Sequence, residues 1–213
     1  MAKYYGDPLG FVRFAYPWGE AGTRLAEAKG PDEWQRDFLA EVGREVRARA
    51  FDGLHAVAPI RQATSSGHGI GKSTVVAWLV DWLMSTRPHA GGTITANTFP
   101  QLRAKTWAAI QYWTGLCITA HWFAVTGERM FHRAHPATWS CAAQTCREEN
   151  SEAFAGQHAA TSSSFYILDE ASAIPEKIWE VAEGGLTDGE PHIYAFGNPT
   201  RSQGKFHRIT FGS

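Results

Sequence analysis

The feature that most constrains how this chain can fold is a glycine-rich segment at residues 66–74, which reads Ser-Gly-His-Gly-Ile-Gly-Lys-Ser-Thr. A short segment with strand character, residues 60–65, precedes it, and an apolar helical segment runs from Lys72 to near Pro88. Glycines let successive backbone N–H groups of a turn point at one ligand, because no Cβ atom is in the way. A glycine loop between a strand and a helix therefore predicts an anion-binding turn at the edge of an α/β sheet.

The loop follows the phosphate-binding pattern G-x-x-x-x-G-K-[ST], with Ser66 in the place of the first glycine. We expect Lys72 to neutralise the β- and γ-phosphates of ATP, and the Ser73 hydroxyl to ligate Mg²⁺. The alternative is an ordinary glycine-rich turn before a helix, with an incidental lysine. The residues predicted to bind nucleotide here are Ser66, Gly67, His68, Gly69, Ile70, Gly71, Lys72, Ser73 and Thr74.

A second motif ends an apolar segment with two acids. Residues 165–170 read Phe-Tyr-Ile-Leu-Asp-Glu, which is typical of a strand buried on both faces of a sheet. Asp169 is predicted to hold Mg²⁺ opposite Ser73, and Glu170 to act as the general base on an attacking water. A strand that ends in solvent-exposed acids is the alternative, and the phosphate loop argues against it.

A third motif closes the last predicted strand, residues 192–196, with Gly197-Asn198-Pro199. Asn198 is a predicted catalytic residue that would contact the γ-phosphate or the lytic water. An ordinary Asn-Pro turn is the alternative. Ligands of parallel sheets bind at the carboxyl ends of the strands, so the loop, the acids and Asn198 are expected to meet.

Upstream of the loop, Pro31-Asp32-Glu33 predicts the start of a helix that continues to about Ala50. Gln35 is predicted to bind the adenine edge of the nucleotide, with Trp34 nearby for stacking, and a helix with one buried tryptophan is the alternative. Three arginines of this helix form either a solvated face or a phosphate-binding patch: Arg44, Arg47 and Arg49.

The rest of the chain alternates strands and helices, which predicts a mostly parallel sheet with helices on both sides. Residues 1–31 carry three prolines and five glycines and are predicted to form an extended arm with little regular structure. The other expected elements are strands at residues 92–98, 130–132 and 138–144, and helices that start at Pro100 and Pro175.

Composition excludes several classes of protein. With 213 residues, of which 44% are hydrophobic and 19% charged, the chain can bury a core and is not predominantly disordered. A formal net charge of −1 excludes a histone-like polycation, so a nucleic-acid partner would need a local basic patch. Nine tryptophans indicate either a heavily packed core or a base-stacking surface.

The cysteines and the opening residues bear on location. Three cysteines do not make a disulfide scaffold, no apolar run is long enough to span a membrane, and no signal sequence opens the chain, so we expect a cytoplasmic protein without a membrane partner. Cys141 and Cys146, with His132 and His135 upstream, do not follow the order of a standard zinc finger. A small strand pair with buried thiols is the favoured interpretation, and a zinc site is the alternative.

Together these residues resemble the N-terminal ATPase domain of phage large terminase subunits, the motors that package double-stranded DNA into capsids. Many ATPases share the phosphate loop and the acid pair, whereas the opening segments and Thr-Ala-Asn-Thr make the resemblance specific. The segments that carry it are residues 7–12, 16–19, 34–35, 66–73, 95–98, 101–102, 168–171 and 197–200.

The resemblance implies a P-loop fold of the additional-strand, catalytic-glutamate type, with a mostly parallel sheet flanked by helices. It implies Mg²⁺-dependent ATP hydrolysis that drives translocation of double-stranded viral DNA into a procapsid in the host cytoplasm. The implied partners are a portal protein, a small terminase subunit and further copies of the chain in a ring. By this similarity residues 66–73 would be the Walker A loop, Asp169 the Walker B acid, Glu170 the catalytic base and residues 197–200 the coupling motif.

Two features complicate the resemblance. His68 stands inside the loop where many relatives place an arginine. The family also uses an arginine finger from a neighbouring subunit, which is worth roughly 10³–10⁵ in rate. The candidates for it are Arg103, Arg147 and Arg201.

Length is the larger departure from the family. The sequence stops at Ser213, so the C-terminal nuclease domain of the relatives is expected to be absent, and nuclease activity with it. The expected division is an N-terminal arm and helix, residues 1–58, packed on an ATPase core, residues 59–213. Two alternatives stay open: a truncated nucleotide-binding and oligomerisation module with little activity alone, or a helicase-like DNA-dependent ATPase.

Overall fold

The computed structural model describes residues 1–65, 67, 69–96, 98–145, 161–198 and 205–206. Its helices are α1 (Pro8–Ala15), α2 (Glu33–Arg49), α3 (Lys72–Thr86), α4 (Phe99–Gln101), α5 (Ala108–Leu116) and α6 (Glu176–Gly184). Shorter turns are η1 (Ala2–Tyr4), the π-helical η2 (Leu102–Trp107), η3 (Ala120–Trp122) and η5 (Ala171–Ala173). The strands are β1 (Ile60–Ser65), β2 (Gly91–Ala96), β3 (Phe123–Val125), β4 (Arg129–His132), β5 (Ser140–Thr145), β6 (Ser163–Asp169) and β7 (Glu190–Gly197).

The strands form one seven-stranded sheet in the order β1-β7-β6-β2-β5-β4-β3. The first five strands in this order pair in parallel, and β4 and β3 extend the sheet as an antiparallel hairpin. The predicted mostly parallel sheet is confirmed, although β3 was not foreseen. β7 lies between β1, which leads to the glycine loop, and β6, which ends in the acid pair, so one additional strand separates these two motifs.

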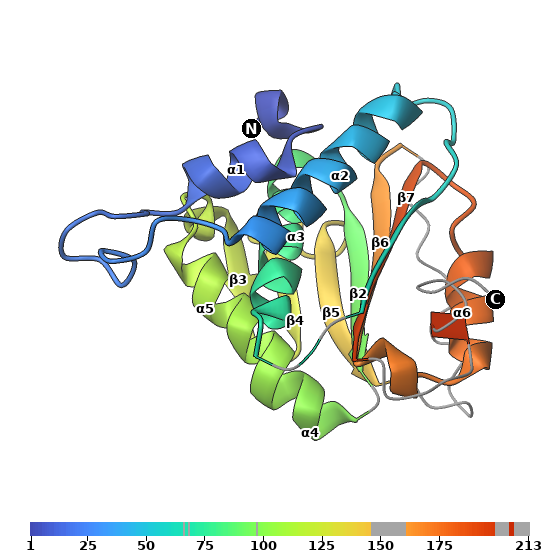
Figure 1. Ribbon diagram of the computed structural model, residues 1–213. Coiled ribbons are helices and arrows are strands. Elements are labelled where there is room, and N and C mark those ends of the chain that lie inside the picture. The colour runs from blue at the N-terminus through green and yellow to red at the C-terminus, as the bar shows by residue number, and fades with distance from the viewer. Residues whose placement is uncertain (66, 68, 97, 146–160, 199–204, 207–213) are drawn as a thin grey trace.

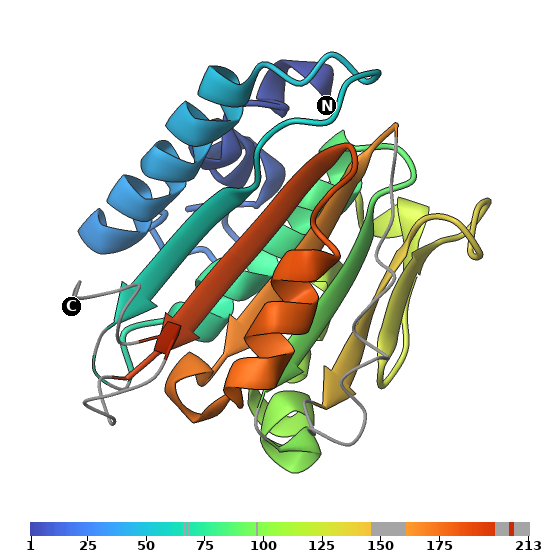
Figure 2. The same ribbon diagram turned by 90° about the vertical axis from the view of Figure 1, so that its right-hand side faces the viewer.

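Helices cover both faces of the sheet. Figure 1 shows α1, α2, α3 and α5 on one side, and Figure 2 shows α6 in front of the opposite side. Residues of β6 alternate between the two sides: Phe165 and Ile167 belong to the larger core, whereas Tyr166 and Leu168 pack with α6. Because β6 is buried along its whole length, the prediction of a strand buried on both faces is confirmed.

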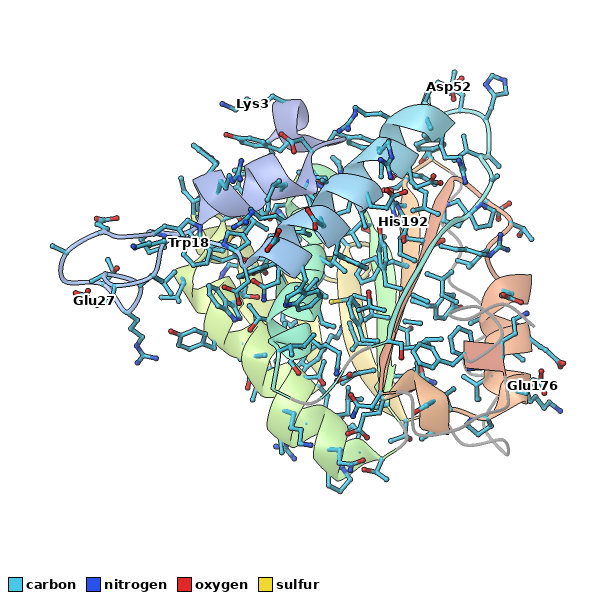
Figure 3. All side chains as sticks on the ribbon, in the orientation of Figure 1. Lys3, Trp18, Glu27, Asp52, Glu176 and His192 are labelled. Atoms are coloured by element: carbon cyan, nitrogen blue, oxygen red, sulfur yellow. The ribbon has the colours of Figure 1, made fainter. Side chains whose placement is uncertain are left out.

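Core and surface side chains separate as expected. In Figure 3 the labelled His192 lies inside the fold, whereas Glu27, Asp52 and Glu176 lie at its surface. Among the helices that the structure describes, none combines the length and the apolar character needed to cross a membrane.

The prediction of an extended arm is wrong for residues 8–15, which form α1. The Asp7 side chain accepts a hydrogen bond from the backbone N–H of Gly10 at 2.9 Å, and Pro8 stands at the start of the helix, where its missing N–H is not needed. Phe11 and Val12 are fully buried. Tertiary packing thus stabilises a short helix whose glycine and proline argued against it.

Helix α3 is buried on every side. All residues from Val75 to Thr86 are buried, so this part of the expected apolar helix has no exposed face. The ring of Trp78 lies 5.1 Å from that of Trp113 and 5.8 Å from that of Trp18, between centroids. These tryptophans supply core packing, as the first of the two interpretations given above expects.

The arginines of α2 are engaged within the chain. Arg49 pairs with Glu45 at 2.9 Å, Arg44 pairs with Glu41, and Arg47 donates a hydrogen bond to the carbonyl of Gly6. Such contacts favour a structural helix face over a phosphate-binding patch.

A buried carboxyl joins three helical segments. Asp81 of α3 is 1% exposed and accepts hydrogen bonds from the hydroxyls of Tyr16, at 2.7 Å, and Thr114, at 2.6 Å. Burial raises the pKa of Asp81 from its usual 3.8 to about 7, and the two hydrogen bonds oppose that rise. The carboxyl therefore stays largely protonated in the folded chain at mildly acidic pH, while it ionises in the unfolded chain.

This raised pKa makes the stability of the fold depend on pH. The stabilising contribution of protonated Asp81 is fully present below pH 3.8. It is lost as pH rises towards about 7, because Asp81 of the unfolded chain releases its proton at a lower pH than Asp81 of the folded chain. The Asp81→Asn variant has no carboxyl to titrate at this position, so it should not lose this stability as pH rises. Between about pH 5.5 and about pH 8, the free energy of unfolding of the variant should gain about 2 kcal/mol relative to wild type. Urea unfolding at both pH values measures it. Asp37→Asn, at an exposed position of α2, is the control, and an Asp81→Asn difference that does not change with pH would contradict the prediction.

Candidate functional site

The glycine loop enters α3 through left-handed backbone. Gly69 has φ +79° and Gly71 has φ +84°, a region that residues with a Cβ atom rarely adopt. A Cβ atom at Gly71 would also lie 2.8 Å from Nε2 of Gln35. The 15 residues of α3 start directly after Gly71, so the N–H groups and the positive dipole end of the helix adjoin the loop.

Residues at the start of α2 contact the glycine loop. The indole N–H of Trp34 donates to the carbonyl of Ile70 at 3.0 Å. That bond gives one loop carbonyl a hydrogen-bond donor from α2. Gln35 is buried, and its Oε1 accepts a hydrogen bond from the backbone N–H of Asp32 at 2.8 Å in a capping box. The assignment of Gln35 to the adenine edge stays a prediction.

Lys72 connects the loop to the end of β7. Its Nζ donates to the carbonyl of Gly67 at 2.6 Å and to Oδ1 of Asn198 at 2.7 Å. Desolvation lowers the pKa of Lys72, and the nearby carboxylate of Asp169 opposes the shift. Two motifs 126 positions apart in the sequence therefore meet at one ammonium group.

Asp169 is held in place by two donors. The hydroxyl of Thr106 donates to Oδ2, and the backbone N–H of Glu170 donates to Oδ1 at 2.9 Å. Thr106 is 1% exposed, so its hydrogen bond is shielded from water. A carboxylate fixed in this way points its remaining lone pairs in defined directions.

Glu170 sits on unusual backbone. Its φ of +51° lies in the left-handed region, which is uncommon for a residue other than glycine and which is concentrated at functional sites. Its Oε1 lies 3.8 Å from Nζ of Lys105, which η2 supplies. The adjacent acids Asp169 and Glu170 thus each have a partner on η2, and these two partners are also adjacent in the sequence.

These groups surround a cavity of about 350 Å³. A neighbouring hollow of about 180 Å³ shares four of its residues and extends towards η5. The lining residues of the larger cavity are Gly69, Gly71, Lys72, Ser73, Thr74, Lys105, Asp169, Glu170 and Asn198. The sequence prediction that the loop, the acids and Asn198 converge is therefore met by their positions.

The donor set at this cavity fits Mg²⁺. The Ser73 hydroxyl and the Asp169 carboxylate offer hard oxygen atoms, and both residues line this cavity. Mg²⁺ typically takes one or two such protein ligands and keeps several waters. The orienting hydrogen bond from Thr106 is of the kind that outer-sphere partners of metal ligands make.

Some predicted residues cannot be placed. Ser66 and His68 of the loop, Arg147 and Arg201 of the arginine candidates, Cys146, and residues 199–200 of the third motif lie outside the described residues. The remaining arginine candidate, Arg103, is exposed on η2.

In the part of the chain that the structure describes, which leaves out Cys146, no group of three or more His, Cys, Asp or Glu is arranged to hold a metal. Cys141 is buried, and the ring of His132 stacks on Trp139 with 4.2 Å between centroids. The interpretation as a strand pair with a buried thiol is favoured.

Sequence reasoning missed Lys105 and Thr106. The helix expected from Pro100 onward forms as α4, η2 and α5. Nothing in the pattern of residues 102–107 indicates a π-helical turn, and the turn decides which side chains reach the acids.

Comparison of the sequence with known proteins finds a relative in Enterobacteria phage P7 that carries the name "Probable terminase, large subunit". The two are 30% identical over 199 residues, which cover 91% of this chain and 37% of the relative. The chain thus spans little more than a third of that relative's length. No protein-family model matches the sequence.

Among solved structures, the crystal structure of the HK97 bacteriophage large terminase is similar with a TM-score of 0.58 and 14% identity, over 95% of this chain and 39% of that one. This likeness confirms the fold class. A large terminase from a thermophilic bacteriophage, solved in complex with ADP, matches with a TM-score of 0.47 and 16% identity over 66% of this chain and 33% of that one.

The contact between α2 and the loop predicts an effect on ligand binding. Trp34→Phe keeps an aromatic ring but removes the N–H that holds the carbonyl of Ile70. If the loop binds nucleotide phosphates as its sequence pattern predicts, loss of one hydrogen bond, worth about 1 kcal/mol, should weaken binding of ADP by roughly fivefold, as measured by isothermal titration calorimetry. Trp122→Phe, at a half-buried position of η3, is the control and should bind like wild type. Equal affinities for wild type and Trp34→Phe would show that the bond is irrelevant to the site.

Proposed function

We propose that this chain, a relative of phage large terminase subunits over 91% of its length, hydrolyses ATP to drive the packaging of double-stranded DNA. One observation carries the proposal: Lys72, Ser73, Asp169, Glu170 and Asn198 line a single cavity at the N-terminus of a buried helix. That set supplies phosphate-binding, metal-binding and basic groups together, as hydrolysis of a triphosphate requires.

In this proposal the loop N–H groups and α3 bind the phosphates, and Lys72 exchanges its two internal acceptors for β- and γ-phosphate oxygens. Asn198 then turns from Lys72 towards the γ-phosphate. Mg²⁺ held by Ser73 and Asp169 would neutralise charge on the phosphate oxygens.

The chemical step needs a base near the γ-phosphate. A water oxygen bonds to the γ-phosphorus while the bond between that phosphorus and the bridging oxygen of ADP breaks, which yields ADP and inorganic phosphate. Glu170 accepts the proton that the water loses. Its backbone is left-handed, whereas Asp169 belongs to the extended strand β6, so the two acids stand on different backbone conformations and can take different roles.

The wider role is proposed from the likeness to a terminase large subunit. We propose a homo-oligomeric ring that acts in the host cytoplasm with a portal protein and a small terminase subunit, and moves double-stranded viral DNA into a procapsid. Residues 1–58 would pack as an N-terminal part on the ATPase core of residues 59–213. The contacts of α1 and α2 with α3 and β1 support that division.

Substitutions separate the proposed roles of the site. Glu170→Gln keeps the shape of the side chain but cannot accept a proton, so we expect turnover to fall at least about 10²-fold while ATP affinity stays close to wild type. Lys72→Ala should lose affinity and turnover together. Phosphate release and calorimetric titration measure the two properties.

Glu176→Gln, at an exposed position of α6, is the matched control and should behave like wild type in both assays. Full turnover by Glu170→Gln would refute the assignment of Glu170 as the base.

An arginine finger supplied by a neighbouring subunit predicts a dependence on protein concentration. Dilute protein should hydrolyse ATP slowly, and the rate per chain should rise steeply as rings form, by up to roughly 10³–10⁵ for a complete finger. Steady-state phosphate release over a series of protein concentrations, with light scattering to follow assembly, measures this. A rate per chain that stays constant while assembly proceeds would argue against a shared site.

A further inference from the structure

The π-helical turn η2 brings two neighbouring residues onto two neighbouring acids. The Thr106 hydroxyl donates a hydrogen bond to Asp169, and the ammonium of Lys105 lies 3.8 Å from the carboxylate of Glu170. Successive residues of a regular helix point about 100° apart. A π turn changes that spacing locally, and such turns are frequent at functional sites.

The two contacts differ in their surroundings. Thr106 is buried, and its bond to Asp169 is a fixed part of the fold. The side chain of Lys105 is 64% exposed and that of Glu170 33%, so their ion pair is screened by water and easily exchanged. Lys105 also lines the cavity that contains Lys72 and the N-terminus of α3.

On the function proposed above, Lys105 would lie within reach of the terminal phosphate. If Glu170 takes a proton from the water that attacks the γ-phosphorus, this phosphate must lie one water molecule away from the Glu170 carboxylate. Lys105 has a flexible four-carbon stem, and its Nζ already lies 3.8 Å from that carboxylate. A γ-phosphate with about two negative charges attracts an ammonium more strongly than one half-exposed carboxylate does.

We propose that Lys105 senses the γ-phosphate: it pairs with Glu170 when that phosphate is absent and moves onto the phosphate oxygens when a nucleoside triphosphate fills the cavity. Glu170 is then released to hold the attacking water. The inference rests on the function proposed above and adds a residue that distinguishes a triphosphate from a diphosphate.

Binding tests the proposal without reference to turnover. The 213-residue chain, with Mg²⁺ present, is titrated with a non-hydrolysable ATP analogue and with ADP. Lys105→Met should weaken binding of the analogue by roughly tenfold, which is the effect of one charge-assisted hydrogen bond, and leave binding of ADP unchanged. Lys105→Arg should restore most of the loss because it keeps the charge. Lys29→Met removes an exposed lysine that does not line the cavity, and it should bind both nucleotides like wild type.

Chemical labelling gives a second readout on the unmodified sequence. Because Lys105 is 64% exposed, an amine-reactive reagent should modify it in the free protein, and mass spectrometry can follow the extent. The analogue should protect Lys105, and ADP should not. Labelling of Lys29 should be the same in all three conditions.

The outcomes separate the two proposals. Equal losses of analogue and ADP affinity in Lys105→Met, or equal labelling of Lys105 with and without the analogue, would overturn the role of Lys105 and leave the proposed ATPase function standing. Wild-type protein that binds neither nucleotide would overturn the proposed function and this inference together.

Discussion

Parallel pairing of β7 with both β1 and β6 is the constraint on which the site depends. In this register Ser65 lies beside Gly197, and Phe196 lies beside Asp169, so the three strands end at nearly the same level of the sheet. The glycine loop, the acid pair and Asn198 each begin where one of these strands stops. Residues far apart in the sequence therefore reach one cavity through main-chain hydrogen bonds alone, before any side chain contributes.

At the opposite end of β6 and β7, buried polar and charged side chains connect the two strands. Glu190, at the start of β7, is fully buried and accepts hydrogen bonds at one oxygen from Arg87 and from Ser163, at the start of β6, both at 2.7 Å. His192 lies 2.9 Å from that oxygen. Burial opposes ionisation, but the charge of Arg87 and the close contact with His192 hold the pKa of Glu190 well below its usual range. Loss of one partner would leave an uncompensated buried charge at this end of the sheet, whereas Glu170 at the other end is half-exposed and its ion pair with Lys105 is screened by water.

The sequence predicts the parts of the site that follow from motifs at strand ends. Asp169 and Asn198 could be placed together because each follows an apolar strand, and the ends of parallel strands share one edge. The helix at residues 8–15 could not be predicted, since packing in the core rather than local propensity stabilises it. Lys105 and Thr106 could not be assigned either, because their direction depends on one π-helical turn. Propensity and period determine where a helix lies, but a single extra residue in a turn determines which side chains face a cavity.

The same turn explains why the site is not isolated from the far edge of the sheet. Thr106 holds Asp169, and the next residue, Trp107, donates its indole N–H to the carbonyl of Thr126 at 2.8 Å, in the turn between β3 and β4. Gln111, one helical turn later, donates to the same carbonyl at 3.0 Å. One helical element thus contacts the acid pair on one side and the edge hairpin on the other. Because Thr106 and Trp107 are both buried, neither contact can change without repacking the other, whereas the exposed Lys105 can exchange partners while the helix stays in place.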